Sequence, residues 1–204
     1  MIKINKPTED HFSWLILGVI FLFCVCAPYT NKWKALLTFS KSKPEQLWRF
    51  VTGHFTHWSW EHLILNLFGL VIFYFLFKKD VSRHSHLGLQ ILTVKSIISA
   101  LTFILLITNF YIFFYYSFEY YLGFSSILYG LYSYCAVRCL VIDKVINGFI
   151  LLTIFSQIQP WFTTYNSSTL IGLTSATDVH TIAVTSGLVL AGYHTVKQCF
   201  TKRI

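Results

Sequence analysis

The chain alternates long apolar stretches with short polar ones, in a pattern typical of helices that cross a membrane. A helix needs about 20 predominantly apolar residues to cross roughly 30 Å of hydrocarbon. Stretches close to this length predict six transmembrane helices, over residues 12–28, 57–77, 87–115, 124–142, 145–162 and 178–197. We therefore expect residues 1–204 to form one all-α membrane domain, a six-helix bundle whose first loop covers 29–56.

The composition favours the same interpretation. Hydrophobic residues make up 55% of the chain and charged residues 12%, whereas the charged share of soluble domains is about 25%. The first apolar stretch could also be a secretory signal, because Val25, Cys26 and Ala27 are small residues. Pro28 follows them directly and Glu9 precedes the stretch, so we expect this helix to be retained.

The basic residues predict the orientation of the bundle. The formal net charge is +8, and most Lys and Arg fall on the side that also holds both termini. Cytoplasmic loops carry the excess of Lys and Arg, so we expect both termini to be cytoplasmic, and we interpret the charge as topology instead of nucleic-acid binding. The first loop is amphipathic, and we expect it to lie in the lipid interface through its apolar residues Trp33, Leu36, Leu37 and Phe39.

Polar residues gather where the second, fourth and sixth predicted helices begin, which this topology places at one depth on the outer face. They are His57, His62 and Asn66, then Gly123, Ser125 and Ser126, and last Asp178 and His180. Such side chains are expensive in lipid and usually mark function. We therefore predict one site at the outer end of the bundle.

Small residues predict which helices pack together there. They recur at four-residue spacing at Ser126 and Gly130 on the fourth helix, and at Ala183, Gly187 and Ala191 on the sixth. Faces of this kind let two membrane helices approach closely. The contact would bring Ser125 against His180.

These residues fit the chemistry of acyl transfer. A serine hydroxyl becomes a good nucleophile when a neighbouring base takes its proton, and neutral imidazole suits that task near neutral pH. Donors must also stabilise the carbonyl oxygen as it becomes negative, and His62, Asn66 and the Ser125 amide are candidates. The set matches the minimum for a serine hydrolase.

The motifs also carry a family resemblance. They are Trp48-Arg49, His57-(x)4-His62-(x)3-Asn66, Gly123-Phe124-Ser125-Ser126 with Tyr129, and His180 with Gly187. In order and placement they resemble the rhomboid intramembrane serine proteases, and most closely the bacterial rhombosortase branch, from about residue 12 to 196. Three positions depart from the usual residues: Ser126 and Ala183 replace glycine, and Tyr129 stands where rhombosortases often have histidine.

The resemblance implies a role for each site residue. Ser125 would be the nucleophile, His180 its general base, and His62, Asn66 and the Ser125 amide the oxyanion hole. Tyr129 would pack on the His180 ring and Arg49 would anchor the first loop, while Gly123, Trp48 and His57 would support the site. No cofactor is implied. The resemblance places the enzyme in a bacterial inner membrane, with its site facing the periplasm and its substrates anchored by a C-terminal transmembrane segment that follows a Gly-Gly motif.

Other functions fit the sequence less well. A general rhomboid protease is the nearest alternative, and an inactive rhomboid-like chaperone for transmembrane helices is another, although such a binder needs neither Ser125 nor His180. A membrane metalloprotease needs His-Glu-x-x-His, but this chain has only Glu61-His62, in the reverse order. We therefore predict no metal site, and we interpret Asp178 as a helix-boundary residue.

Overall fold

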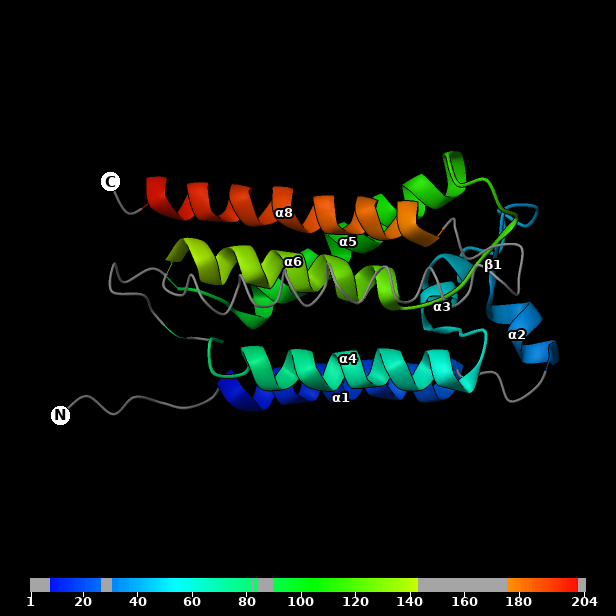
Figure 1. Ribbon diagram of the computed structural model, residues 1–204, viewed down its shortest axis with the longest axis horizontal. Coiled ribbons are helices and arrows are strands. Elements are labelled where there is room, and N and C mark those ends of the chain that lie inside the picture. The colour runs from blue at the N-terminus through cyan, green and yellow to red at the C-terminus, as the bar shows by residue number, and fades with distance from the viewer. Residues whose placement is uncertain (1–7, 27–30, 82, 84–89, 143–175, 202–204) are drawn as a thin grey trace.

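The structure is a computed structural model, and it describes residues 8–26, 31–81, 83, 90–142 and 176–201. Long helices run along the long axis of the molecule, and short elements gather at one end (Figure 1). In chain order the elements are α1 (Thr8–Cys26), α2 (Asn31–Leu37), β1 (Phe39–Ser40), α3 (Arg49–Phe55), α4 (Trp60–Phe77), α5 (Val94–Phe114), β2 (Tyr120–Tyr121), α6 (Ser125–Ile142) and α8 (Ala176–Thr201).

Five of the six predicted helices correspond to α1, α4, α5, α6 and α8, and the predicted helix over 145–162 lies outside the described residues. Two helices begin later than predicted, because side chains that cap their N-termini set the first helical residue. Extended Ser59 accepts a hydrogen bond from the His62 amide (3.3 Å), which starts α4 at Trp60 instead of 57. Thr93 and Ser96 form a capping box that starts α5 at Val94 instead of 87.

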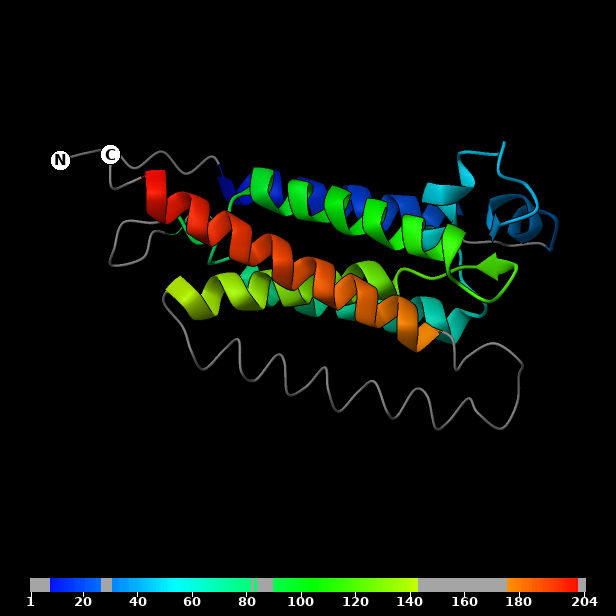
Figure 2. The same cartoon turned by 90° about the horizontal axis from the view of Figure 1, so that it is seen from above.

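The long described helices run in two opposite directions. In Figure 1, α4, α6 and α8 all begin at the end that holds α2, α3 and β1, while α1 and α5 run the opposite way. Helix α6 lies inside the bundle and contacts α8, α5 and α4. Seen from above, α8 crosses over the space between α5 and α6 (Figure 2). Three helix beginnings therefore meet at one end, as the topology predicts.

The bundle is apolar outside as well as inside. Phe12 and Phe23 of α1 pack with Leu70 and Phe73 of α4 in the core, yet large apolar side chains also cover the outer surface, among them Ile64, Phe68, Phe75 and Leu106. A helix that is apolar all round suits a bilayer. Among the described helices, α4 and α5 are long and apolar enough to span one.

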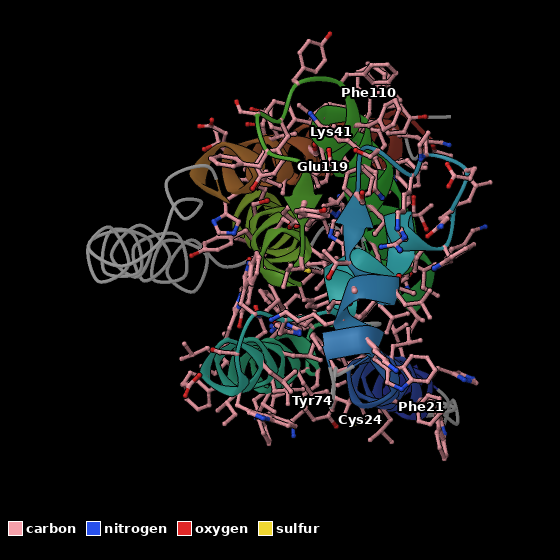
Figure 3. The ribbon with its side chains drawn as sticks, turned by 90° about the vertical axis from the view of Figure 1, so that its right-hand side faces the viewer. Phe21, Cys24, Lys41, Tyr74, Phe110 and Glu119 are labelled. Atoms are coloured by element: carbon pink, nitrogen blue, oxygen red, sulfur yellow. The ribbon has the colours of Figure 1, made fainter. Side chains whose placement is uncertain are left out.

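The first loop contains short helices and a strand where the sequence predicts only an interfacial loop. Its strand β1 pairs antiparallel with β2, with Phe39 opposite Tyr121, and the Lys41 amide donates to the Glu119 carbonyl (3.0 Å). Figure 3 looks onto this end, with Lys41 and Glu119 close together beside the two strands. Trp33 and Leu36 are exposed as expected, but Phe39 is only 2% exposed. Its interfacial assignment is wrong, because strand pairing carries it into a core formed with α5.

Arg138 is a basic residue that lies in the interior of the bundle. The side chain is 2% exposed and donates hydrogen bonds to the carbonyls of Gln90 and Ile91 and to the side chains of Thr195 and Gln198. These partners come from α8 and from the segment before α5. Arg138 therefore joins three parts of the chain at the end opposite the predicted site.

Candidate active site

Ser125 and His180 lie in hydrogen-bond contact. Ser125 begins α6, His180 lies on the second turn of α8, and the distance from Ser125 Oγ to His180 Nε2 is 2.7 Å. This distance suits proton transfer from a hydroxyl to an imidazole. The two residues are neither fully buried nor fully exposed, which suits a pair that a substrate must reach.

Close packing of α6 on α8 produces this contact. A Cβ on Gly187 would lie 2.2 Å from the Gly130 carbonyl oxygen, and a Cβ on Gly130 would lie 2.9 Å from the Ala183 carbonyl oxygen. No side chain fits at those distances, so the two backbones touch directly. The Ser133 hydroxyl adds a hydrogen bond across the contact to the Val184 carbonyl (3.0 Å). The helix contact is the one that the small-residue faces predict.

Tyr129 lies against the ring of His180. The ring centroids are 4.6 Å apart and the ring planes differ by 33°. Tyr129 lies one helical turn after Ser125, so the same face of α6 carries the serine and the ring that contacts its partner histidine. The contact restricts rotation of the imidazole and keeps Nε2 directed at Ser125.

His62 reaches the same place from α4. A Cβ on Gly123 would lie 2.9 Å from His62 Cε1 and 3.8 Å from Ser125 Oγ, so Gly123 lies between the imidazole and the serine. Gly123 also has φ +129°, a backbone conformation that residues other than glycine rarely adopt. Both the close approach and the backbone conformation therefore require glycine here. Asn66 is buried one turn after His62, with its side chain donating to the His62 carbonyl (3.1 Å).

His57 lies behind His62. It precedes α4 in the loop, is 2% exposed, and its ring centroid is 5.0 Å from that of His62. Burial, together with the nearby His62, lowers the pKa of His57 to about 3, so the ring is neutral at pH 7. Its Nδ1 donates to the Phe55 carbonyl (3.1 Å), which leaves Nε2 as an acceptor, buried without a hydrogen-bond partner among the described residues.

Trp48 and Arg49 belong to a separate cluster in the first loop. The Arg49 guanidinium donates to the carbonyls of Ala35 (2.8 Å) and Thr38 and to the Gln46 side chain. The Trp48 ring is 47% exposed, and its N–H donates to the Leu36 carbonyl (3.3 Å). These contacts hold α2 and the residue before β1 against the start of α3. The two residues thus act on the loop and not on the reacting groups.

Sequence reasoning gives little weight to two residues that lie at this site. His54 is buried, bonds Asn109 of α5 (3.1 Å) and contacts the ring of Tyr121; burial lowers its pKa to about 4. Tyr121 is 5% exposed and directs its hydroxyl at the serine turn. His54 lies three residues before His57 and Tyr121 two residues before Gly123, but neither stands at a spacing that predicts a role.

The arrangement provides a nucleophile, a base and neighbouring donors. Asp178 is exposed at the start of α8, so the side chains that are closely paired here are Ser125 and His180. Within the described ranges, no three His, Cys, Asp or Glu side chains come together as a metal site. The chemistry that this geometry suits is nucleophilic attack by an activated serine.

Comparison with known families decides the relationship. The model of the rhomboid domain matches residues 44–196. The chain belongs to the rhomboid family. A comparison with curated proteins finds no match. Rhomboids are generally serine proteases that act on membrane proteins within the bilayer, and with its apolar helices this rhomboid is an integral membrane protein. Helix α1 precedes the matched region, yet Phe12 and Phe23 are fully buried in the common core.

Proposed function

We propose that this rhomboid is a serine endopeptidase whose catalytic residues are Ser125 and His180. The 2.7 Å distance between Ser125 Oγ and His180 Nε2 is the observation that carries the proposal. Support also comes from the neighbours of the pair, since Tyr129 contacts the base and Gly123 separates the serine from His62 by no more than a glycine backbone. An inactive helix-binding protein has no need of this arrangement.

The reaction proceeds in two halves. His180 Nε2 takes the proton of Ser125 Oγ, which attacks the scissile carbonyl carbon and pushes its electron pair onto the oxygen. When the tetrahedral intermediate collapses, the C–N bond breaks and His180 gives the proton to the leaving amine. Water then attacks the acyl-enzyme while His180 accepts its proton, and collapse releases a carboxylic acid and returns the proton to Ser125.

His62, Asn66 and the Ser125 amide act as the oxyanion hole in this proposal. The His62 ring N–H and the two amides donate to the oxygen when it becomes negative, and each such donor stabilises the transition state more than the substrate. The tight space around Gly123 supports this assignment, because it holds His62 beside the nucleophile.

The proposed topology has six spans with both termini in the cytoplasm. The site then opens at the outer face, and in a bacterial inner membrane it faces the periplasm. Support comes from the three helix beginnings that meet at one end, together with the excess of Lys and Arg on the other side. The enzyme would cut near the outer end of a substrate's transmembrane segment.

The finer proposal is rhombosortase-type processing. Its support is the resemblance of the residues around Trp48, His54 and Ser125 to those of rhombosortases. The substrates would carry a C-terminal Gly-Gly motif, a hydrophobic helix and a basic tail. A general rhomboid protease would cut membrane proteins without that motif. Paired substrates that differ only in Gly-Gly against Ala-Ala separate the two: a rhombosortase prefers the first, and equal cleavage contradicts the finer proposal.

The test of activity is labelling by a fluorophosphonate probe, which reacts only with activated serines. The purified protein in detergent should be labelled, and both Ser125→Ala and His180→Ala should abolish labelling. Two matched controls should stay labelled: Ser186→Ala, whose hydroxyl donates to the Ile182 carbonyl of its own helix (2.7 Å), and His194→Ala, an imidazole farther along α8 that bonds Tyr134 (2.8 Å). A folded wild type that resists the probe contradicts the proposal.

A further inference from the structure

Tyr121 lies at the point where the first loop meets the serine turn. It belongs to β2 and pairs with Phe39 of β1. Its ring contacts His54 at 5.2 Å and Tyr116 at 6.0 Å between centroids, both edge to face. The side chain is 5% exposed. A tyrosine in this setting needs partners for its hydroxyl.

The hydroxyl of Tyr121 bonds two groups of the serine turn. It donates to the Gly123 carbonyl (3.1 Å) and lies 2.7 Å from Ser126 Oγ. A phenol carries one proton, which the Gly123 carbonyl uses, so the Ser126 hydroxyl must donate to the Tyr121 oxygen. The result is a directed chain from Ser126 through Tyr121 to Gly123. Burial raises the pKa of Tyr121, so the hydroxyl keeps its proton at any working pH.

These two hydrogen bonds fix the backbone at Gly123, which would otherwise rotate freely. Gly123 has φ +129° and no side chain, so its neighbouring peptide planes have little steric restraint. Its N–H donates to the Gly53 carbonyl (3.1 Å), and its carbonyl accepts from Tyr121. Both polar groups of Gly123 are therefore held, one by the first loop and one by the tyrosine. Rotation of this peptide would move Ser125 relative to His62.

Gly53 makes the contact between the first loop and the turn very close. A Cβ there would lie 3.0 Å from Phe39 Cβ and 3.3 Å from the Tyr121 carbonyl oxygen. Helix α3 thus touches both strands of the small sheet with its backbone. A shift of one backbone segment here would therefore move the others, which contain Phe39, Gly53, Tyr121 and Gly123. The hydroxyl of Tyr121 connects these segments to the serine turn by its hydrogen bonds.

We propose that Tyr121 is a positioning residue for the reaction, with Ser126 as its hydrogen-bond donor. It acts through Gly123 and never touches the reacting atoms. By holding the Gly123 carbonyl away from the substrate oxygen it keeps the Ser125 amide directed toward the developing negative charge. The inference deepens the proposed serine protease activity and depends on it. It also gives a function to the hydroxyl of Ser126, at a position where the small side chain alone would serve helix packing.

The test uses Tyr121→Phe, which removes one oxygen and keeps the ring. The matched control is Tyr120→Phe, its neighbour in β2, whose side chain is 57% exposed. The rate of inactivation by the fluorophosphonate probe is measured at increasing probe concentration, to separate the limiting rate from the apparent affinity. Tyr121→Phe should lower the limiting rate about tenfold, the factor expected for loss of the hydrogen bond that holds the Gly123 carbonyl, with unchanged apparent affinity. Tyr120→Phe should match the wild type.

Ser126 supplies a second variant that does not depend on the tyrosine. Ser126→Ala should lower the limiting rate in the same direction by a smaller factor, because Tyr121 keeps its bond to Gly123. The double variant should be no slower than Tyr121→Phe, since the two hydroxyls act in one chain. Should Tyr121→Phe fail to fold, Ser126→Ala decides alone, and a wild-type rate in it overturns the inference.

The outcomes distinguish the inference from the activity on which it rests. A wild type that the probe does not label overturns the proposed protease, and the inference with it. A labelled wild type with an equal limiting rate in Tyr121→Phe overturns only the inference. A lower labelled fraction at an unchanged limiting rate does so too, because it shows that Tyr121 stabilises the fold without orienting the turn.

Discussion

At the end where α4, α6 and α8 begin, Ser125 bonds His180 and lies near His62. His57 lies against His62, and its Nε2 atom is buried with no hydrogen-bond partner in the described part of the chain. At the opposite end the buried Arg138 has four acceptors from α8 and the segment before α5. Both ends bury polar side chains in an apolar bundle. At the second end these side chains are satisfied, which is what a structural network requires.

The contrast suggests separate tasks for the two ends. Unsatisfied buried groups cost free energy and persist where a function needs them. Around the first end the side chains of His62, Ser125 and His180 are partly exposed, while the donors of Arg138 are consumed by hydrogen bonds within the protein. Substitutions at the first end should therefore change chemistry, and substitutions at the second should change stability.

The largest effect is expected for the reacting pair. Ser125→Ala and His180→Ala should each lower cleavage of a transmembrane substrate in liposomes by at least about 10³-fold, because neither residue can act without the other. Helix content and unfolding temperature should stay at wild-type values. Cleavage by either variant within tenfold of the wild type would show that another group performs the reaction.

A somewhat smaller effect is expected for Asn66, the proposed oxyanion donor. Asn66→Ala should reduce turnover by roughly 10² to 10³ without a matching change in KM, as is usual when one donor to an oxyanion is lost. Leu65→Ala, on the neighbouring exposed position of α4, serves as the control and should keep wild-type turnover. An Asn66→Ala enzyme as fast as the control would remove Asn66 from the oxyanion hole.

At the other end, Arg138→Met should change stability and leave catalysis intact. It deletes hydrogen bonds to two backbone carbonyls and two side chains, so the free energy of unfolding in mixed micelles should fall by ~3 kcal/mol. Lys95→Met removes a charge that is not buried, near the start of α5, and should change stability by less than ~0.5 kcal/mol. If folded Arg138→Met protein showed strongly reduced turnover per active site, Arg138 would affect catalysis as well as stability, which would contradict the separation of the two ends.

The smallest effect concerns pH. The pKa of His54 is lowered to about 4 in the fold by burial, against about 6.5 in an unfolded chain. Between these two pH values His54 binds more protons in the unfolded chain than in the fold. The contribution of His54 to the free energy of unfolding is therefore fully present above about pH 6.5 and is lost as the pH drops toward 4. His54→Gln should therefore lose less stability than the wild type between pH 7 and pH 5. Equal losses would show that His54 does not contribute to this dependence.

The sequence predicts much of this arrangement, for physical reasons that are local. The positions of the described helices follow from hydropathy, although the caps at Ser59 and Thr93 start two of them later than hydropathy alone predicts. The contact between α6 and α8 follows from the spacing of small residues such as Gly130 and Gly187, since small side chains let two backbones approach closely. That contact is enough to predict that Ser125 and His180 meet.

The first loop and Arg138 could not be predicted in the same way. The pairing of Phe39 with Tyr121 joins segments far apart in the chain, and two-residue strands have no periodicity of their own. Arg138 appears in the sequence as one more cation, because its acceptors are backbone carbonyls and residues of α8 that only the fold brings near. Tyr121 escapes prediction for a similar reason: an aromatic run near a helix end is typical of an interface belt.

The central claim is tested most directly by locating the probe on the protein. After labelling with the fluorophosphonate, digestion and mass spectrometry should find the phosphonyl group on Ser125 alone. The adduct should be absent from His180→Ala and present in His194→Ala. An adduct on another serine, or none on a folded wild type, would contradict the assignment of Ser125 and His180 as the catalytic pair.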